Sequence, residues 1–182
     1  MLPFALALTA STYLLSAIVG FAARRPDYSH FKNTISELGE AGAASARLVS
    51  FGVFLPVGLT LLLVAVLARP VEADAALLAL CIAVGYVVAA IFPCDPGSPV
   101  SGSPRQAVHN LGGGVEYIGG ALALWRLSKT HGLLFQVAAL IVGAAAVALS
   151  IPSLPGIRGL VQRVAEAALF AGLTLSQWQA AD

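Results

Sequence analysis

Residues capable of acid–base chemistry gather where the first long apolar stretch ends, in the segment YSHFKNTISELGE from Tyr28 to Glu40. Two further segments, FPCDPG and HNLGGGVEYIGG, each place a titratable side chain beside another apolar stretch. Carboxylates and imidazoles often move protons in enzymes, and a serine hydroxyl becomes a nucleophile when a base lies within hydrogen-bond reach. The sequence therefore predicts a site whose candidate catalytic residues are Ser36, Glu37, Asp95 and His109, with His30 and Asn110 as candidate substrate-binding residues.

Two of these carboxylates also have a structural interpretation. The run from Thr34 to Glu37 fits a capping box, in which a hydroxyl at the start of a short helix and a carboxylate three residues later satisfy backbone amides. Asp95 lies between two prolines, where an aspartate commonly closes an Asx-type turn. The spacing alone leaves both interpretations open.

Ionisable residues also interrupt the apolar segments themselves. Glu116 follows His109 by nearly two helical turns, so the two side chains share one helix face. Glu116 would lie about 18 Å along a helix that begins at Pro104, near the middle of a bilayer, where a carboxylate usually faces the bundle interior. The last apolar segment offers Arg163 at comparable depth. The sequence predicts that Glu116 meets Arg163 directly or through water, and that the binding residues include Glu116, Arg163 and Glu166.

The cofactor stays unknown at this point. Two imidazoles with nearby carboxylates would suit zinc or another divalent metal, and an open coordination position would allow hydrolysis. However, the chain has no HExxH run and no paired cysteines, and His131 is predicted at the opposite end of the bundle from His30 and His109. A divalent metal is therefore one alternative among several.

The chain that carries these residues is 58% hydrophobic and only 10% charged, with a mean hydropathy of +0.87. Its apolar segments are about 20 residues long and match the hydrocarbon thickness of a bilayer. The net charge of +1 argues against nucleic acid as a partner. The sequence predicts an all-α fold, a polytopic integral membrane bundle of six transmembrane helices. Residues 1–182 would form a single transmembrane domain with helices at about 2–23, 44–68, 75–92, 104–127, 132–151 and 157–178.

Six crossings place the first, third and fifth loops at one end of the bundle, here called the odd-loop end. Both termini then lie with the second and fourth loops at the even-loop end. The first and third loops hold most of the polar residues, so Glu37, Asp95 and His109 are predicted to converge at the odd-loop end. Lys and Arg are also more frequent there. The positive-inside rule therefore predicts a multi-pass cell-membrane protein with a cytoplasmic odd-loop end and extracytoplasmic termini.

Four segments together resemble a known family: YSHFKNTISELGE, FPCDPG, HNLGGGVEYIGG and RGLVQRVAEAALFAGLTL. The resemblance covers nearly the whole chain. It is to bacterial and archaeal membrane proteins of unknown function, domain-of-unknown-function family nine-nine-eight. That family is distantly similar to eukaryotic membrane proteins of lipid-anchor remodelling and autophagy modulation. The resemblance implies a bundle of six or seven helices in which Ser36, Glu37, Asp95 and His109 belong to a shared site, and it names no reaction.

A second resemblance is to the ceramidase and progestin-receptor group of intramembrane zinc hydrolases, which also use a serine, an aspartate and histidines inside a helical bundle. Those proteins require three histidine ligands. This chain departs from that pattern, because it cannot place three histidines at one end of the bundle.

Two classes of function follow from these observations. One is an intramembrane enzyme that acts on a lipid or other amphiphile, and the other is a non-enzymatic protein that binds or transports a lipid or small solute. The even-loop halves of the apolar segments have few polar residues, which favours a one-sided polar pocket over a path through the bilayer. The predicted partners are membrane lipid and an amphiphilic substrate, and the oligomeric state is left open.

Overall fold

The computed structural model describes residues 1–152 and 156–180, and every regular element within them is a helix. The helices form six consecutive rods, which confirms the predicted all-α six-helix bundle. The first rod is α1 (Leu2–Ala22), and the third is α4 (Ala73–Ile91). The other rods are α2, η2 and α3 (Ala46–Val49, Ser50–Phe54, Leu55–Ala68), then α5, η3 and α6 (Pro104–Gly114, Val115–Gly119, Gly120–His131), then α7 (Leu133–Leu149) and α8 (Arg158–Gln179).

Three of these rods are long and apolar enough to cross a bilayer: Leu2–Ala22, Ala46–Ala68 and Ala73–Ile91. α7 is apolar but shorter, and the remaining two rods carry the polar residues described below. Large apolar side chains such as Leu15 and Val66 face outward on the rods. A hydrocarbon solvent accepts such side chains without cost, so the protein is a membrane protein.

Local sequence explains where the rods begin and end. The Ser103 hydroxyl caps α5 by accepting a hydrogen bond from the Gln106 amide at 3.2 Å, with Pro104 in the first turn. The fourth rod extends to His131, beyond the predicted end near residue 127. It stops because Gly132 adopts φ +91°, a conformation open to glycine, and the chain reverses there into α7.

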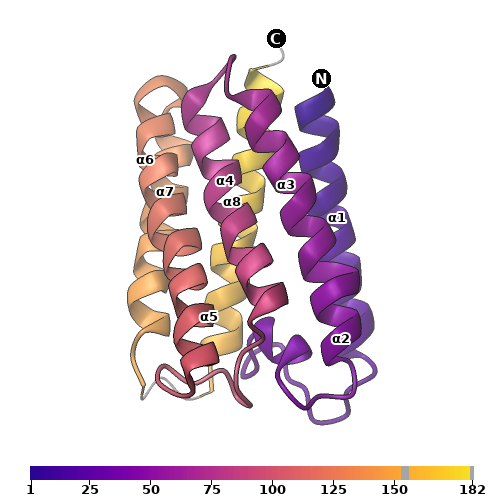
Figure 1. Ribbon diagram of the computed structural model, residues 1–182. Coiled ribbons are helices and arrows are strands. Elements are labelled where there is room, and N and C mark those ends of the chain that lie inside the picture. The colour runs from indigo at the N-terminus through magenta and orange to yellow at the C-terminus, as the bar shows by residue number, and fades with distance from the viewer. Residues whose placement is uncertain (153–155, 181–182) are drawn as a thin grey trace.

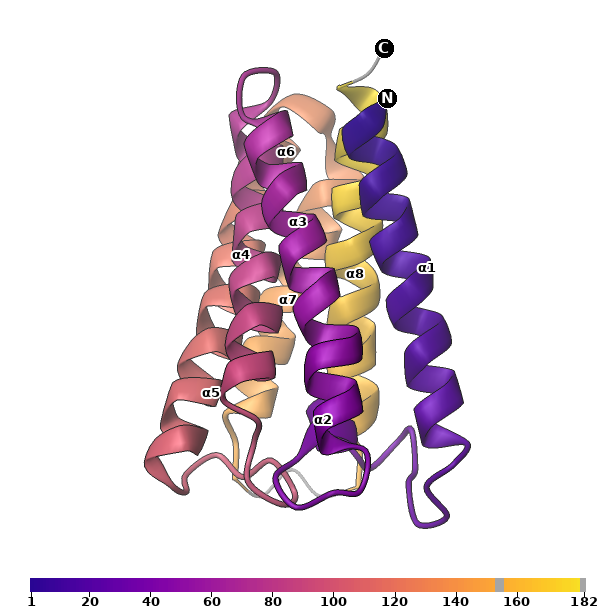
Figure 2. The ribbon, with the colours of Figure 1, turned by 45° about the vertical axis from the view of Figure 1, so that its right-hand side comes forward.

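Consecutive rods run antiparallel, so both termini lie at the even-loop end (Figure 1). The first and third loops fold over the opposite, odd-loop end, where a short 3₁₀ helix, η1 (Ser36–Gly39), lies under the bundle. α4 lies inside the bundle against α3, α5, α6 and α8, while α1 covers α3 and α8 from the side (Figure 2). The core around α4 consists of fully buried leucines and isoleucine, such as Leu78, Ile82 and Leu169.

Two rods contain a π-helical turn, η2 in the second and η3 in the fourth. A π turn inserts one extra residue and changes the direction of the side chains that follow, and such turns are frequent at functional sites. Glu116 and Tyr117 both lie in η3 and both are buried. The fourth rod is therefore irregular at the point where its carboxylate enters the bundle.

Candidate functional site

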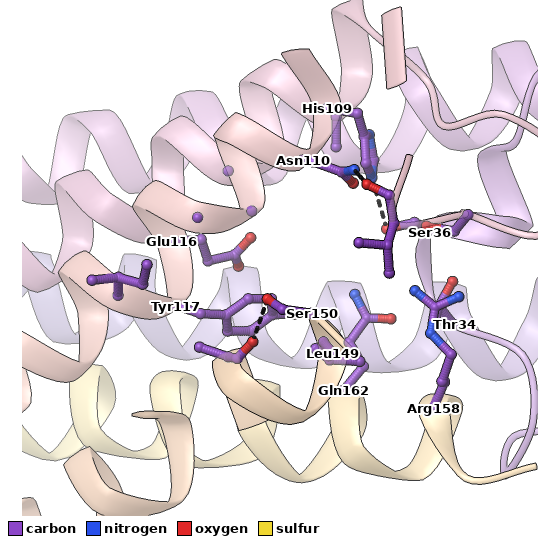
Figure 3. A pocket seen from close by; sticks show the side chains of 18 residues that line it. Thr34, Ser36, His109, Asn110, Glu116, Tyr117, Leu149, Ser150, Arg158 and Gln162 are labelled. Carbon is purple, nitrogen blue, oxygen red and sulfur yellow. Dashed lines mark hydrogen bonds between the residues drawn. The ribbon is translucent and has the colours of Figure 1, made fainter. Parts of the chain in front are cut away.

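A cavity of about 220 Å³ lies between η1, the fourth rod, α7 and the start of α8 (Figure 3). Among the residues that line it are Ser36, His109, Asn110, Glu116, Arg158 and Gln162. Ser36 and His109 lie at the odd-loop end. Glu116 lies about 10 Å further along the same rod than His109. We call the Ser36–His109 part the rim of the cavity and the Glu116 part its floor.

At the rim, a serine hydroxyl and a histidine lie within hydrogen-bond distance. The Nδ1 atom of His109 is 2.9 Å from the carbonyl oxygen of Phe92, which can only accept, so Nδ1 carries the proton. Nε2 is therefore the bare nitrogen, and it lies 3.2 Å from the Ser36 hydroxyl. His109 is 9% exposed, whereas Ser36 is half-buried and faces the cavity. The arrangement is that of a nucleophile, a base and a group that orients the base.

The capping interaction around Glu37 holds Ser36 in place. One carboxylate oxygen accepts hydrogen bonds from the Thr34 amide at 2.7 Å and the Thr34 hydroxyl at 3.0 Å, and the other accepts from Asn33 at 2.6 Å. Next to it, the Ile35 amide donates to the Gln162 side chain of α8 at 2.6 Å. Glu37 does not line the cavity. The structure thus places this candidate catalytic residue in the capping role.

Asp95 occupies a similar structural position in the third loop. Its carboxylate accepts from the Ser103 amide at 2.7 Å, the Ser103 hydroxyl at 2.8 Å and Arg105 at 2.6 Å. The Ser103 amide and hydroxyl, followed by Arg105, hold the pKa of this carboxyl below its usual range. The Asp95 amide donates to the buried Gln106 side chain at 2.6 Å. Asp95 therefore fixes the start of α5, one turn before His109, rather than facing the cavity.

The three segments predicted to converge do meet at the odd-loop end. His109 contacts Ser36 of the first loop and Phe92 just before the third loop. The carboxylates of Glu37 and Asp95 nevertheless point into their own loops and away from the cavity. Their positions therefore do not support the predicted acid–base role. Asn110 does line the cavity, and its amide donates to the Val100 carbonyl at 2.8 Å.

At the floor, the carboxyl group of Glu116 from η3 lies within hydrogen-bond reach of a second buried carboxyl group, Glu166 from α8, which lies behind the cavity lining. Each is 6% exposed. Glu166 accepts hydrogen bonds from the Tyr117 hydroxyl at 2.6 Å and the Tyr86 hydroxyl at 2.9 Å. In contrast, no donor among the described residues reaches Oε1 of Glu116. Gly85 leaves space for this group, because a Cβ there would lie 2.2 Å from Oε2 of Glu116.

The predicted pairing of Glu116 with Arg163 is wrong. Arg163 turns toward the first loop and donates to the carbonyl oxygens of His30 and Asn33, both at 2.8 Å, and to the Tyr28 hydroxyl. Burial raises the pKa of Tyr28, so the phenol stays neutral and accepts this bond. The long side chain reaches backbone carbonyls at the bundle end before it can reach the floor. Arg163 does not line the cavity. Its hydrogen bonds stabilise the first loop, which carries Ser36.

His30 also lies outside the cavity. Its ring is exposed and packs edge-on against Tyr28, with ring centroids 5.6 Å apart. Partial burial, followed by the nearby Arg163 charge, lowers the pKa of His30. The predicted role of His30 in substrate binding therefore finds no support in its position.

Sequence reasoning missed two cavity residues on α8, Arg158 and Gln162. They are four residues apart and so lie on one helix face, together with Glu166 four residues further on. That spacing was visible in the sequence and could have identified Gln162. Arg158 gave no such signal, because a cation at a helix start in the odd-loop end is equally expected from membrane topology.

Within residues 1–152 and 156–180, no three His, Cys, Asp or Glu side chains come together as a metal-ligand set. Both ring nitrogens of His109 have partners inside the protein. The divalent-metal alternative thus has no ligand set in this part of the chain.

A family model described as "Protein of unknown function (DUF998)" matches residues 8–179, a span that contains the whole cavity. No curated protein and no solved structure matches the chain. The resemblance to that family is confirmed, while the distant similarity to lipid-remodelling proteins stays a prediction.

Proposed function

Because the chain belongs to the DUF998 family, whose description names no reaction, we propose its function from the site: an intramembrane enzyme that cleaves or transfers an acyl group of an amphiphile. Ser36 is the nucleophile and His109 is the general base. The observation that carries the proposal is the continuous arrangement of the Ser36 hydroxyl, the bare Nε2 of His109, and the Phe92 carbonyl bound to Nδ1. Both side chains open onto the cavity, where an acyl carbonyl has room to approach.

In the first step the Ser36 oxygen bonds to the substrate's carbonyl carbon while its proton moves to Nε2 of His109. The bond from that carbon to the leaving alcohol or amine then breaks, and His109 returns the proton to the leaving group. Water or a second alcohol, activated in the same way, releases the acyl group. The Phe92 carbonyl holds the imidazole in the required tautomer throughout. A neutral carbonyl stabilises an imidazolium less than a carboxylate does, so we expect slow turnover.

The negative charge that develops on the carbonyl oxygen needs hydrogen-bond donors. Arg158 and Gln162 project from one face of α8 into the cavity opposite Ser36 (Figure 3). The Gln162 carbonyl is occupied by the Ile35 amide, which leaves the side-chain NH₂ available as a donor. We assign the stabilisation of the oxyanion to Arg158 and Gln162.

An apolar groove beside the cavity supports an amphiphile as substrate. Its lining comes from η3, α6 and α7, and it shares Ile118, Ala146 and Ser150 with the cavity. Its lining includes small residues such as Gly143 and exposed apolar residues such as Val147. An acyl chain lying in this groove, with its polar end in the cavity, would enter laterally from the bilayer without crossing water.

The test uses the purified protein in phosphatidylcholine nanodiscs with a fluorophosphonate probe and a decanoyl ester of 4-nitrophenol. We expect covalent labelling at Ser36 and ester hydrolysis, both reduced by about 10²-fold or more in Ser36→Ala and in His109→Gln. Ser29→Ala is the matched control, because this serine lies in the same loop but does not line the cavity. A folded wild-type protein that is neither labelled nor active would overturn the proposal, as would labelling that persists in Ser36→Ala.

A non-enzymatic role in binding or moving a lipid or small solute is the second candidate. The observation that favours it is the floor of the cavity, since the Ser36–His109 chemistry does not require the Glu116–Glu166 pair. That role predicts that Ser36→Ala retains the biological activity and that substitutions at the floor abolish it.

A further inference from the structure

At the floor of the cavity, a carboxylate oxygen has no hydrogen-bond donor within the part of the chain that the structure describes, and no arginine or lysine side chain of that part lies beside it. Glu166 has a tyrosine hydroxyl on each oxygen, whereas Oε1 of Glu116 has no donor among the described residues. Figure 3 shows the Glu116 carboxyl group directed into the cavity. A buried polar atom without a partner is rare in folded proteins, and it commonly marks the position of a ligand.

The charge at the floor leads to the same inference. Two adjacent carboxylates inside a bilayer cannot both stay ionised without a counterion, so they take up protons or bind a cation. With one shared proton the pair has a net charge of −1, which a bound ammonium would neutralise. The nearest arginines of α8 do not neutralise it, because Arg163 binds the first loop and Arg158 lies toward the rim.

We propose that the Glu116–Glu166 pair binds the primary ammonium group of an amphiphilic amine, with N–H groups donated to the Glu116 carboxyl. The proposal takes from the proposed function only that the ligand enters this cavity. If the enzyme assignment also holds, the substrate is an amine-bearing lipid whose ammonium lies at the floor and whose acyl carbonyl lies at the rim.

The space around Glu116 suits a compact headgroup. The cavity of about 220 Å³ is far larger than the roughly 10–15 Å³ that one water molecule requires. Gly85, Gly113 and Gly114 line it without side chains, so an ammonium and a short carbon linker can approach the carboxyl group. A primary ammonium has three N–H donors, whereas a trimethylammonium group has none and gains nothing from Oε1 of Glu116.

The probes are hexylamine, hexanol and hexyltrimethylammonium, each titrated into the purified protein in phosphatidylcholine nanodiscs by calorimetry. Hydrogen bonds that involve charged groups change affinity by about tenfold to a hundredfold. We therefore expect hexylamine to bind at least about tenfold more tightly than either analogue. This comparison uses only the wild-type protein and does not depend on whether a variant folds. Equal binding of the three probes would overturn the proposal.

Two variants separate this proposal from the enzyme assignment. Glu116→Gln keeps the shape of the side chain and should remove the preference for hexylamine, whereas Asp74→Asn, at the even-loop end, should retain it. Ser36→Ala should bind hexylamine as the wild type does. A wild-type protein that prefers hexylamine but neither hydrolyses the ester nor is labelled at Ser36 would reject the enzyme alone. Hexylamine binding that is unchanged in Glu116→Gln would reject the amine site alone.

Discussion

At the even-loop end, polar side chains join the start of α4 to the end of α6. Arg126 lies 2.7 Å from Asp74, and His131 lies 3.3 Å from Glu72, with Arg126 largely exposed. At the odd-loop end, Glu37 is buried and accepts three hydrogen bonds from its own loop, and Arg163 donates to two carbonyls and a phenol of the first loop. The even-loop pairs join the ends of two helices. The odd-loop side chains instead hold a loop in a fixed conformation over the cavity.

This difference indicates where stability depends on polar residues. Short turns need little support, because the helices on either side fix the positions of their ends. The first loop runs from the end of α1 to the start of α2 and has no long helix of its own, so side chains must satisfy its backbone. The same bonds that stabilise this loop also fix Ser36 against His109.

The largest expected effect is at Arg163. Arg163→Gln should lower the stability by about 3 kcal/mol, because it leaves the His30 and Asn33 carbonyls without their donor. Arg126→Gln, the matched change at the even-loop end, should cost less than about 1 kcal/mol, since the pair is exposed. Thermal unfolding in detergent, followed by tryptophan fluorescence, measures both. Equal losses would show that the two ends do not differ as described.

Glu37→Gln should cost about 2 kcal/mol, because an amide NH₂ replaces one of the two oxygens that accept from Thr34 and Asn33. Glu72→Gln is the matched glutamate at the even-loop end, where the side chain caps α4 through a 3.3 Å contact with the Asp74 amide. Its cost should stay near about 0.5 kcal/mol. The same thermal assay compares them, and a larger loss for Glu72→Gln would contradict the comparison.

Asp95 should make the thermal stability of the protein depend on pH. Its pKa is lower in the folded protein, so its contribution is present above the ordinary pKa of an aspartate, about 3.9, and is lost as the pH falls through the folded value. Thermal midpoints measured from neutral pH downward should therefore fall more steeply in acid for the wild type than for Asp95→Asn. Ser103→Ala keeps its backbone N–H bond and should give an intermediate slope. Identical acid slopes for all three proteins would disprove the assignment.

The sequence predicted the rods well because bilayer thickness requires long apolar segments, and these are visible without any tertiary information. It also predicted that the first and third loops meet the start of the fourth rod, since the number of crossings determines which loops share an end. The helix start at Pro104 was predicted from local residue types alone. These features depend on length, order or short-range spacing.

The details of the site depend on information that spacing does not contain. The long side chain of Arg163 can reach several hydrogen-bond acceptors, so the position of Arg163 along α8 did not identify its partner. The direction of the Glu116 side chain depends on the π turn η3. No residue pattern in the fourth apolar segment predicted this turn. The use of the Phe92 carbonyl by His109 is a backbone contact, and such contacts leave no signature in side-chain types.

The last comparison concerns which end faces the cytoplasm, and it should not change stability. Seven Lys and Arg residues lie near the odd-loop end (Arg24, Arg25, Lys32, Arg47, Arg105, Arg158 and Arg163) and three near the even-loop end (Arg69, Arg126 and Lys129). The positive-inside rule therefore predicts a cytoplasmic odd-loop end. Ser101 and Thr130 are exposed at opposite ends, and the Thr130 hydroxyl bonds only to the Leu127 carbonyl of its own helix, so either residue can become a cysteine.

In intact cells, a membrane-impermeant maleimide should label Thr130→Cys and leave Ser101→Cys unlabelled until the membrane is opened. Background labelling should be low, because Cys81 and Cys94 are both buried and burial raises the pKa of Cys94 to about 12. The reverse pattern would invert the orientation and place the cavity on the extracytoplasmic side. An amphiphile would then reach the Ser36–His109 rim from the outer leaflet, so this experiment also decides which leaflet supplies the proposed ligand.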